Sequence, residues 1–187
     1  MYAKKGANIN AKNYKGNSLL HILSFSSCLN KVDLWSFLIK KGANINVKND
    51  LNETPLHIAV NNGISSNALE NLLNLGADVK ARTHEGKNAL HYLVMGWDDR
   101  NNNPNFQLLG NLLVKKGLDV NSQDYKGDTP LHEIARKYRK SQSAIKFLLN
   151  NGAKTDIENG NNKIPLELAI SKKSVNLKFF SDLSRQD

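Results

Sequence analysis

The sequence lacks several features that mark other classes of protein. Its 187 residues include one cysteine, Cys28, which excludes a disulfide framework and makes a reducing compartment the default. No apolar run approaches the roughly 18 residues of a membrane-spanning helix. No charged segment followed by an apolar one resembles a signal peptide. We therefore expect a cytoplasmic protein without a membrane span.

Sheet-forming segments and phosphate-binding loops are also missing. No stretch alternates between apolar and polar residues for long enough to predict a sheet, and the glycines are scattered. Positive charge is in excess, because 26 Lys and Arg face 17 Asp and Glu, a net charge of +9. The heavy use of asparagine and lysine is typical of an AT-rich genome, and it indicates a virus, a protist or an intracellular bacterium as the source.

Five glycines each precede a similar tetrapeptide whose fourth residue lies 15 positions later, as from Gly42 to His57. The glycines are Gly6, Gly42, Gly76, Gly117 and Gly152, and the tetrapeptides are SLLH (18–21), TPLH (54–57), NALH (88–91), TPLH (129–132) and IPLE (164–167). From one tetrapeptide to the next glycine the distance varies: 21, 19, 26 and 20 residues. A fixed segment alternating with a variable one predicts a stacked repeat protein.

Each unit is predicted to be a turn followed by two helices. Thr54 is a helix N-cap followed by proline at the first helical position, and each glycine ends the preceding helix in a left-handed conformation. Ile164 cannot cap, so we expect a weaker helix entry in the last unit. The first helices are expected near 18–26, 54–62, 88–96, 129–138 and 164–172, and the second helices near 32–41, 66–75, 106–116, 142–151 and 174–183.

The residues carry a family resemblance. The segments GANINVKNDLNETPLHIAV (42–60) and GLDVNSQDYKGDTPLHEIA (117–135) resemble the ankyrin repeat, over essentially the whole chain. The resemblance implies an all-α, ankyrin-type helix-turn-helix solenoid with hairpin-like finger loops. We expect one domain, 1–187, with about four full repeats, a partial N-terminal repeat end at 1–10 and a C-terminal capping repeat at about 152–187. The segment 1–5 is either a natural start or the end of a helix from a longer protein.

Catalysis and metal binding are not expected. The histidines His21, His57, His91 and His132 recur in successive repeats, so neighbours should lie roughly 8–10 Å apart and cannot share one zinc ion. A structural role in hydrogen bonding between adjacent turns is the expectation. Cys28 has no orienting group or oxyanion donors for nucleophilic chemistry. The sequence therefore predicts no catalytic residue, no metal ligand, no cofactor and no enzyme activity.

The resemblance implies a concave surface, formed by the finger tips and the outer side of the first helices, that binds another protein. Aromatic and basic residues at these positions are candidate contacts. The candidates are Tyr14, Phe25, Leu51, His84, Met95, Trp97, Tyr125, Lys126, Arg136, Lys137 and Lys172. We expect a monomeric binding module, and one interpretation is a pathogen or viral protein that binds a protein of its host. The alternative is a scaffolding or targeting arm of a larger enzyme whose catalytic domain is outside this chain.

A late basic cluster, 136–140 followed by lysines, has three interpretations. It could recruit an acidic segment of a partner protein, attract nucleic acid, or keep the solenoid soluble. No aromatic-lined groove or recognition helix favours nucleic acid. Reversing Arg136 and Lys137 to glutamate is expected to weaken binding and to leave thermal stability nearly unchanged.

Two further features stand out. The third repeat carries an insertion at 95–106, and its Trp97 either packs on its own repeat, which we favour narrowly, or contacts a partner. The ankyrin resemblance also implies that Asn46 and Asn121 could be hydroxylated by the asparaginyl hydroxylase of such repeats, since each has a leucine eight residues earlier. The alternative is that each asparagine hydrogen-bonds within its own turn.

Overall fold

The structure, a computed structural model, describes residues 8–25, 31–98, 105–137, 141–173, 176 and 178. Among them it forms nine helices and no strand beyond a single bridge, between Lys12 and Ser18. The helices are α1 (Leu19–Phe25), α2 (Lys31–Lys40), α3 (Pro55–Asn61), α4 (Ser66–Asn74), α5 (Ala89–Gly96), α6 (Asn105–Lys115), α7 (Pro130–Ala135), α8 (Gln142–Asn150) and α9 (Pro165–Ser171). The expected all-α solenoid is confirmed.

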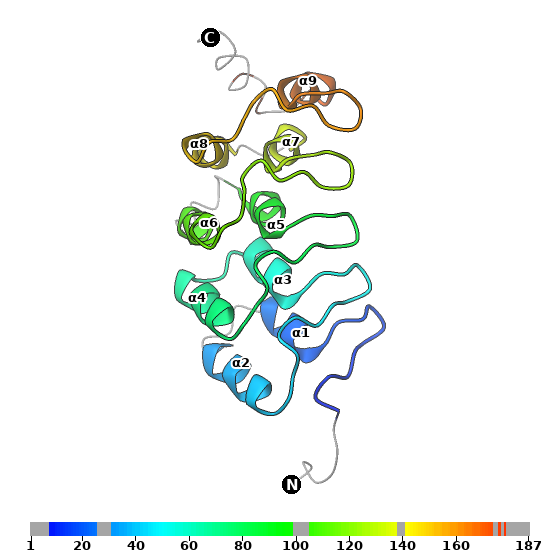
Figure 1. The fold of residues 1–187 in the computed structure, drawn as a ribbon, viewed down its shortest axis with the longest axis vertical. Coiled ribbons are helices and arrows are strands. Elements are labelled where there is room, and N and C mark those ends of the chain that lie inside the picture. The colour runs from blue at the N-terminus through cyan, green and yellow to red at the C-terminus, as the bar shows by residue number, and fades with distance from the viewer. Residues whose placement is uncertain are drawn as a thin grey trace.

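The helices form two parallel columns (Figure 1). The odd-numbered helices α1 to α9 stack in one column, and α2, α4, α6 and α8 stack in the other. Each helix packs on its counterpart in the next repeat, as α3 does on α1 and α5. A long loop before each odd-numbered helix projects sideways as a finger, so the fingers form a third row along the stack.

The predicted helix positions agree with the structure to within a few residues. The largest difference is α7, which ends at Ala135 rather than near residue 138. Several expectations lie outside the described residues: the partial repeat end before residue 8, Cys28, the centre of the insertion at 99–104, and almost all of the last expected helix, 174–183.

Each tetrapeptide holds its helix entry with the side chain of its last residue. In the second repeat the backbone N–H of Thr54 donates to Nδ1 of His57 over 3.2 Å, and Pro55 begins the helix. The same bond forms from Ser18, Asn88 and Thr129 to their histidines. In the last repeat Ile164 does not cap with its side chain, but its N–H donates to Oε2 of Glu167 over 3.1 Å. The glutamate therefore replaces the histidine at this helix entry.

The glycines end the even-numbered helices as expected. Gly42 has φ of +92°, and the next residue, Ala43, donates its N–H to the carbonyl of Leu38 over 2.9 Å. The same left-handed conformation recurs at the glycines 76, 117 and 152. A β-carbon would be strained at this φ, which explains why glycine returns at this position of the repeat.

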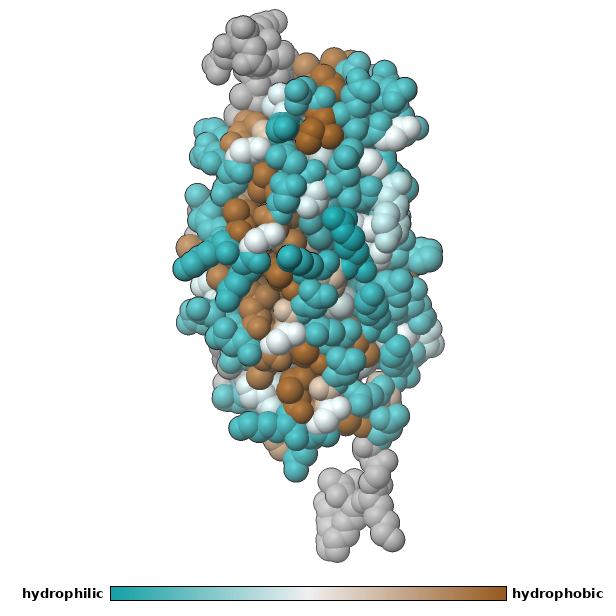
Figure 2. Space-filling view, in the orientation of Figure 1, coloured by the Kyte–Doolittle hydropathy of each residue, from teal (hydrophilic) through white to brown (hydrophobic). Residues whose placement is uncertain are grey.

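The core is a continuous seam between the two helix columns. Leu72, Leu113 and Leu148 are fully buried at the same position of three successive even-numbered, or outer, helices, four residues before the terminal glycine, and Trp35 is the largest fully buried side chain among the described residues. Figure 2 shows hydrophobic residues that reach the surface as a band along the long axis, bordered by hydrophilic residues on both sides. Each repeat thus completes its core only against its neighbours.

Asparagine side chains fasten one repeat to the next. Asn46 donates its amide N–H to the carbonyl of Gly76 over 3.0 Å, and its Oδ1 accepts the N–H of Asp78 over 2.8 Å. Asn10 and Asn121 make the same pair of bonds to the following repeat. In the third repeat this position is occupied by Lys80, whose ammonium can donate but cannot accept a hydrogen bond. The junction between repeats three and four therefore lacks this two-bond clamp.

The clamp leads to a prediction about stability. Asn46→Ala should lower the free energy of unfolding by about 1–2 kcal/mol, because it removes two hydrogen bonds to backbone groups. Lys80→Asn should raise it by up to about 1 kcal/mol by supplying the missing clamp. Urea unfolding measures both. Lys80→Ala is the matched control, because it removes the lysine without adding an amide. Equal stability of the two Lys80 variants would contradict the clamp.

Candidate protein-binding face

Each finger closes through a polar side chain that accepts from its own turn. In the second repeat Oδ1 of Asn49 accepts the N–H groups of Leu51 and Glu53, over 3.0 and 2.9 Å. Asn13, Asp124 and Asn159 make the same two bonds in their repeats. These bonds fix the turn geometry locally, so each tip presents its side chains in a defined direction.

Neighbouring fingers are joined at their tips by backbone hydrogen bonds. The N–H of Asp50 donates to the carbonyl of Lys15, and that of His84 to Leu51, over 3.3 and 2.9 Å. The series continues from Tyr125 to Glu85 and from Gly160 to Lys126, over 2.9 and 2.8 Å. All five described fingers are therefore linked into one row.

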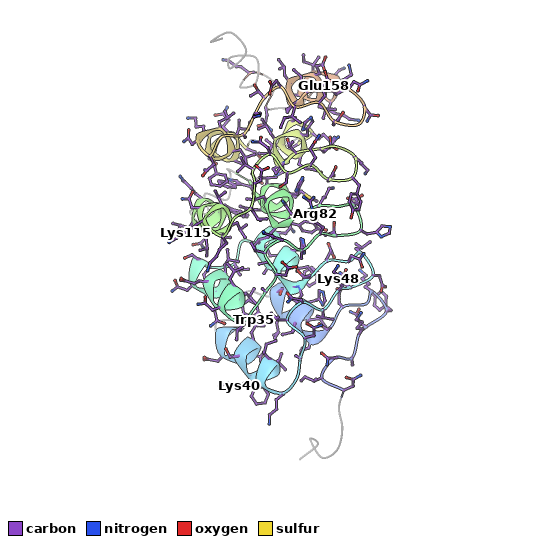
Figure 3. The ribbon with its side chains drawn as sticks, viewed as in Figure 1. Trp35, Lys40, Lys48, Arg82, Lys115 and Glu158 are labelled. Atoms are coloured by element: carbon purple, nitrogen blue, oxygen red, sulfur yellow. The ribbon has the colours of Figure 1, made fainter. Side chains whose placement is uncertain are left out.

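Long side chains brace the same row from below the tips. Nη1 of Arg82 donates to the carbonyl of Gln123 over 2.9 Å, and Nε2 of Gln123 donates to that of Glu158 over 3.0 Å. Arg82 and Lys48 lie on the fingers, away from Lys40 and Lys115 at the ends of the outer helices (Figure 3). The braces were missed at the sequence level, although a long polar residue recurs one position before each turn residue.

The tips carry exposed hydrophobic and aromatic side chains. Tyr14 is 88% exposed, Tyr125 is 74% exposed and Leu51 is 60% exposed, and His84 is exposed on the tip between the last two. The Tyr125 ring lies over Gly86 of the preceding finger, where an added β-carbon would come within 2.5 Å of it. The side chains expected at the tips thus lie together along the finger row.

The candidate residues on the inner helices are also exposed. Phe25 on α1 and Met95 on α5 each lie four residues after the tetrapeptide histidine, with exposed fractions of 56% and 40%. Lys172, just after α9, is exposed as well, and Lys126 on the fourth finger is largely exposed while its Nζ lies 3.4 Å from Oε1 of Glu85. These positions are available for contact with another molecule.

Trp97 does not belong to the exposed set. It is 5% exposed, and its ring stacks on Phe106 at a centroid distance of 5.4 Å and lies 5.7 Å from Phe147. Its Nε1 donates to Oγ of Ser143 over 3.0 Å. The favoured interpretation, that Trp97 packs on its own repeat, is correct for Phe106. The contact with Phe147 also joins the third repeat to the fourth. Burial removes Trp97 from the candidate contacts.

Arg136 and Lys137 are engaged within the fold. Nη2 of Arg136 lies 2.6 Å from Oδ2 of Asp128, a carboxylate that is almost fully buried, and Lys137 donates to the carbonyl of Trp97. The expectation that both charges could be reversed without loss of stability is wrong, because the reversal would bring negative charge beside the Asp128 carboxylate. The sequence did not reveal this pairing, since no local pattern links residue 136 to the preceding finger.

A polar network continues from this ion pair along the middle repeats. Nζ of Lys87 lies 2.8 Å from Glu85 and 3.0 Å from Glu133. The hydroxyl of Tyr92 donates to Glu53 over 2.7 Å, and burial together with this hydrogen bond raises the pKa of Tyr92. The carboxylates of this network thus have partners within the fold, Glu85 and Glu133 with Lys87 and Glu53 with Tyr92.

One group of carboxylates could hold a metal ion. Asp124, Asp128 and Glu133 each bring one oxygen within 4.8 Å of the others, the one such group in the described part of the chain. Two of them are paired with protein cations, Asp128 with Arg136 and Glu133 with Lys87. The cluster is therefore best understood as part of the polar network.

The tetrapeptide histidines link adjacent repeats. Nε2 of His21 donates to the carbonyl of Glu53 over 3.0 Å, and His91 and His132 make the same bond to Asp128 and Lys163. His57 differs, because its Nε2 does not make this bond and its ring lies edge-on to Tyr92, 5.0 Å away. Three of the four histidines thus connect their repeat to the next through Nε2.

The Asp128–Arg136 pair leads to the second prediction. Arg136→Ala should lower the free energy of unfolding by about 2–3 kcal/mol, because it leaves a buried carboxylate without its cation. Adding Asp128→Asn should recover part of that loss, since the amide carries no charge. The exposed Lys172→Ala should change stability by less than about 0.5 kcal/mol. Thermal or urea unfolding of the four proteins measures this, and equal effects of Arg136→Ala and Lys172→Ala would contradict the pairing.

Histidine burial leads to the third prediction. Burial lowers the pKa of His57 to about 4, and it also lowers the pKa of His21, His91 and His132. Below about pH 6.5 the unfolded chain therefore binds more protons than the folded one, so stability must fall with pH. His57 alone should contribute a loss of about 1 kcal/mol between pH 6.5 and 5.5.

Urea unfolding at these two pH values measures the slope. His57→Gln should reduce the slope by that amount even though it also lowers stability at pH 7.5. A stability that is constant or rises as the pH falls from 6.5 to 5.5 would show that the histidines are not held neutral.

Comparisons with known proteins agree with this geometry. The sequence profile described as "Ankyrin repeats (3 copies)" matches residues 20–109 and 100–180. Separately, no helix in the described part of the chain has both the length and the apolar character needed to cross a membrane.

Three relatives match parts of the chain. It is 32% identical over 161 residues to the nuclear factor NF-kappa-B p105 subunit of Gallus gallus, over 83% of this chain and 15% of the relative. It is 36% identical over 80 residues to the 2-5A-dependent ribonuclease of Mus musculus, over 42% and 10%. It is 38% identical over 58 residues to a probable serine/threonine-protein kinase of Dictyostelium discoideum, over 30% and 7%. The chain thus spans less than a sixth of each relative, and the profile match over most of its length shows that it belongs to the ankyrin-repeat family.

Proposed function

We propose that this chain is a non-enzymatic protein-binding module whose contact surface is the finger row with the adjacent inner-helix positions. We define this surface, the finger face, by Tyr14, Phe25, Leu51, His84, Met95 and Tyr125. The observation that carries the proposal is the exposure of Tyr14, Leu51 and Tyr125 on tips that are linked by backbone hydrogen bonds. Ankyrin repeats are protein-interaction modules, which supports the same assignment.

Pre-organisation favours binding at this surface. Exposed aromatic and leucine side chains cost free energy in water, and they gain it when a partner covers them. Because the tips are tied to one another, little backbone entropy should be lost on binding. The finger face therefore combines apolar contact area with a low ordering cost.

Charge at the tips suggests what the partner presents. The first and fourth fingers share the turn Tyr-Lys-Gly, at 14–16 and 125–127, with Lys15 and Lys126 exposed beside the tyrosines. Nζ of Lys15 lies 5.6 Å from the Tyr14 ring centroid. A partner segment with carboxylates beside apolar residues would complement both tips. With Arg136 and Lys137 engaged internally, Lys15 is the better candidate for recognition of an acidic segment, and Lys126, whose Nζ lies 3.4 Å from Oε1 of Glu85, would exchange that carboxylate for one of the partner.

Affinity capture with matched variants tests the proposal, and it is our fourth prediction. The tip variant combines Tyr14→Ala, Leu51→Ala and Tyr125→Ala, and the control is Leu108→Ala, which removes an exposed leucine from outer helix α6. Both should keep the melting temperature within a few degrees, because the side chains are exposed. Quantitative mass spectrometry should find bound proteins whose recovery falls at least about tenfold with the tip variant and is unchanged with the control.

The same capture can contradict the proposal. If every specifically bound protein is recovered equally by the tip variant, the finger face is not the contact surface. If the Leu108→Ala control loses the partner instead, binding occurs on the outer helices.

The alternative, an arm of a larger enzyme, has support from the comparisons. The mouse ribonuclease and the Dictyostelium kinase, both named as enzymes, are matched over only 10% and 7% of their length. An antibody against the described residues distinguishes the two in native tissue or cells. A band at the mass of the 187 residues favours the binding module, and a much larger band favours the arm.

Asn46 and Asn121 remain proposed targets of asparaginyl hydroxylation. The amide nitrogen and the amide oxygen of each side chain are both hydrogen-bonded to the next repeat. Modification would therefore require the junction to open locally. An unchanged intact mass after treatment with the hydroxylase would remove this proposal.

A further inference from the structure

The first repeat exposes hydrophobic side chains at positions that are buried in later repeats. On α1, Leu19 and Ile22 are exposed, whereas their counterparts Pro55 and Ile58 on α3 are buried. On α2, Leu34 and Phe37 are exposed, with Phe37 at 53%. We call Leu19, Ile22, Leu34 and Phe37 the first-repeat face.

Counting from the glycine that ends each outer helix identifies the counterparts on the outer column. Leu34 corresponds to Ala68, Leu109 and Ala144, and all three are buried. Phe37 corresponds to Phe147, which is 3% exposed. In repeats two to four the helices at these positions pack on those of the preceding repeat, as α4 does on α2 and α8 on α6. The first-repeat face therefore continues the same stacking surface, and no described helix packs on it.

The environment of Phe147, the buried counterpart of Phe37, shows which residue a neighbouring helix needs opposite a phenylalanine at this position. Gly110 on α6 lies against Phe147, and a β-carbon added to it would come within 2.4 Å of the Phe147 ring. The ring of Phe147 thus fits only because the preceding outer helix has no side chain there. A helix that covers Phe37 in the same way needs a glycine seven residues before its terminal glycine.

We propose that the first-repeat face is a stacking surface for one more ankyrin-type helix pair, supplied in cis by polypeptide that runs into Gly6, with glycine opposite Phe37. This surface is separate from the finger face. Four exposed apolar side chains on one end of a stack are unusual, because the terminal repeat of a solenoid normally turns a polar face outward. The continuity with the established α1–α3 and α2–α4 contacts identifies the occupant as a repeat and not an extended peptide.

A grafted repeat tests the proposal. Residues 1–5 are replaced by a copy of residues 76–116, so that the copied helices run into Gly6 as the originals run into Gly117. The copy carries its own glycine, from Gly110, at the position opposite Phe37. The graft should raise the melting temperature by at least about 4 °C. Phe37→Ala should hardly change the melting temperature of the ungrafted chain but should lower that of the grafted chain.

A double-mutant cycle isolates the contact. Gly110→Ala, made only in the copied segment, should remove much of the gain when Phe37 is present and little of it together with Phe37→Ala. A second measurement does not depend on stability. In a Cys28→Ser background, the thiol of Phe37→Cys should be alkylated at least about tenfold more slowly in the grafted chain, while that of Leu108→Cys should react equally in both.

Three outcomes would overturn the proposal. One is a graft that neither raises the melting temperature nor protects position 37. Another is a cycle in which the copied Gly110→Ala has the same effect with and without Phe37→Ala. The third is sedimentation of the ungrafted chain as a dimer that Phe37→Asp dissociates, which would identify the occupant as a second copy.

Discussion

In three of the four tetrapeptides that end in histidine, at His21, His91 and His132, the histidine joins two hydrogen bonds that hold the stack together. Its Nδ1 accepts the N–H at its own helix entry, as in Ser18 to His21, and its Nε2 donates to a carbonyl of the next repeat, as in His21 to Glu53. One neutral imidazole can do both, because it has one acceptor nitrogen and one donor nitrogen. Helix entry and repeat stacking are therefore coupled, and burial of the ring, which lowers its pKa, keeps it in the neutral form that this coupling requires.

In the rest of the core, residue size varies from repeat to repeat, and a small side chain in one repeat is compensated by larger side chains in the next. The position seven residues before the terminal glycine holds Trp35, Leu69, Gly110 and Ile145 in successive repeats, although each lies in the core seam. Where it shrinks to Gly110, the next repeat supplies Phe147, and Trp97 packs on the same ring. The third junction thus replaces a missing Asn clamp, at Lys80, with a cluster of three aromatic rings. Core volume is conserved across a junction and not within a repeat.

Because adjacent repeats share their core, some features could be predicted from the sequence and others could not. The helix positions, their caps and their terminal glycines follow from residues close together in the chain, and they were predicted to within a few residues. The burial of Trp97 and the pairing of Arg136 with Asp128 involve separate elements of the stack, with no local sequence pattern connecting the partners. The exposure of the candidate side chains was therefore predicted well at the tips, where it follows from position in the turn, and poorly at the basic cluster, where Arg136 pairs with Asp128 on the finger of its own repeat and Lys137 donates to the Trp97 carbonyl of the preceding repeat.

The tips differ from the rest of the structure in how they are held together. Their links run between backbone groups, such as His84 N–H to the Leu51 carbonyl, so the side chains at the tips have no part in those links. One position of the turn accordingly holds Tyr14, Asp50, His84, Tyr125 and Gly160 in the five fingers. Elsewhere the side chains themselves connect the repeats, as His21, Asn46 and Arg82 do, so these positions need a side chain that can make the connecting bond. A row whose geometry is independent of the side chains at its tips can change the chemistry of those tips without losing its shape, which is the physical reason to look for recognition at the finger face.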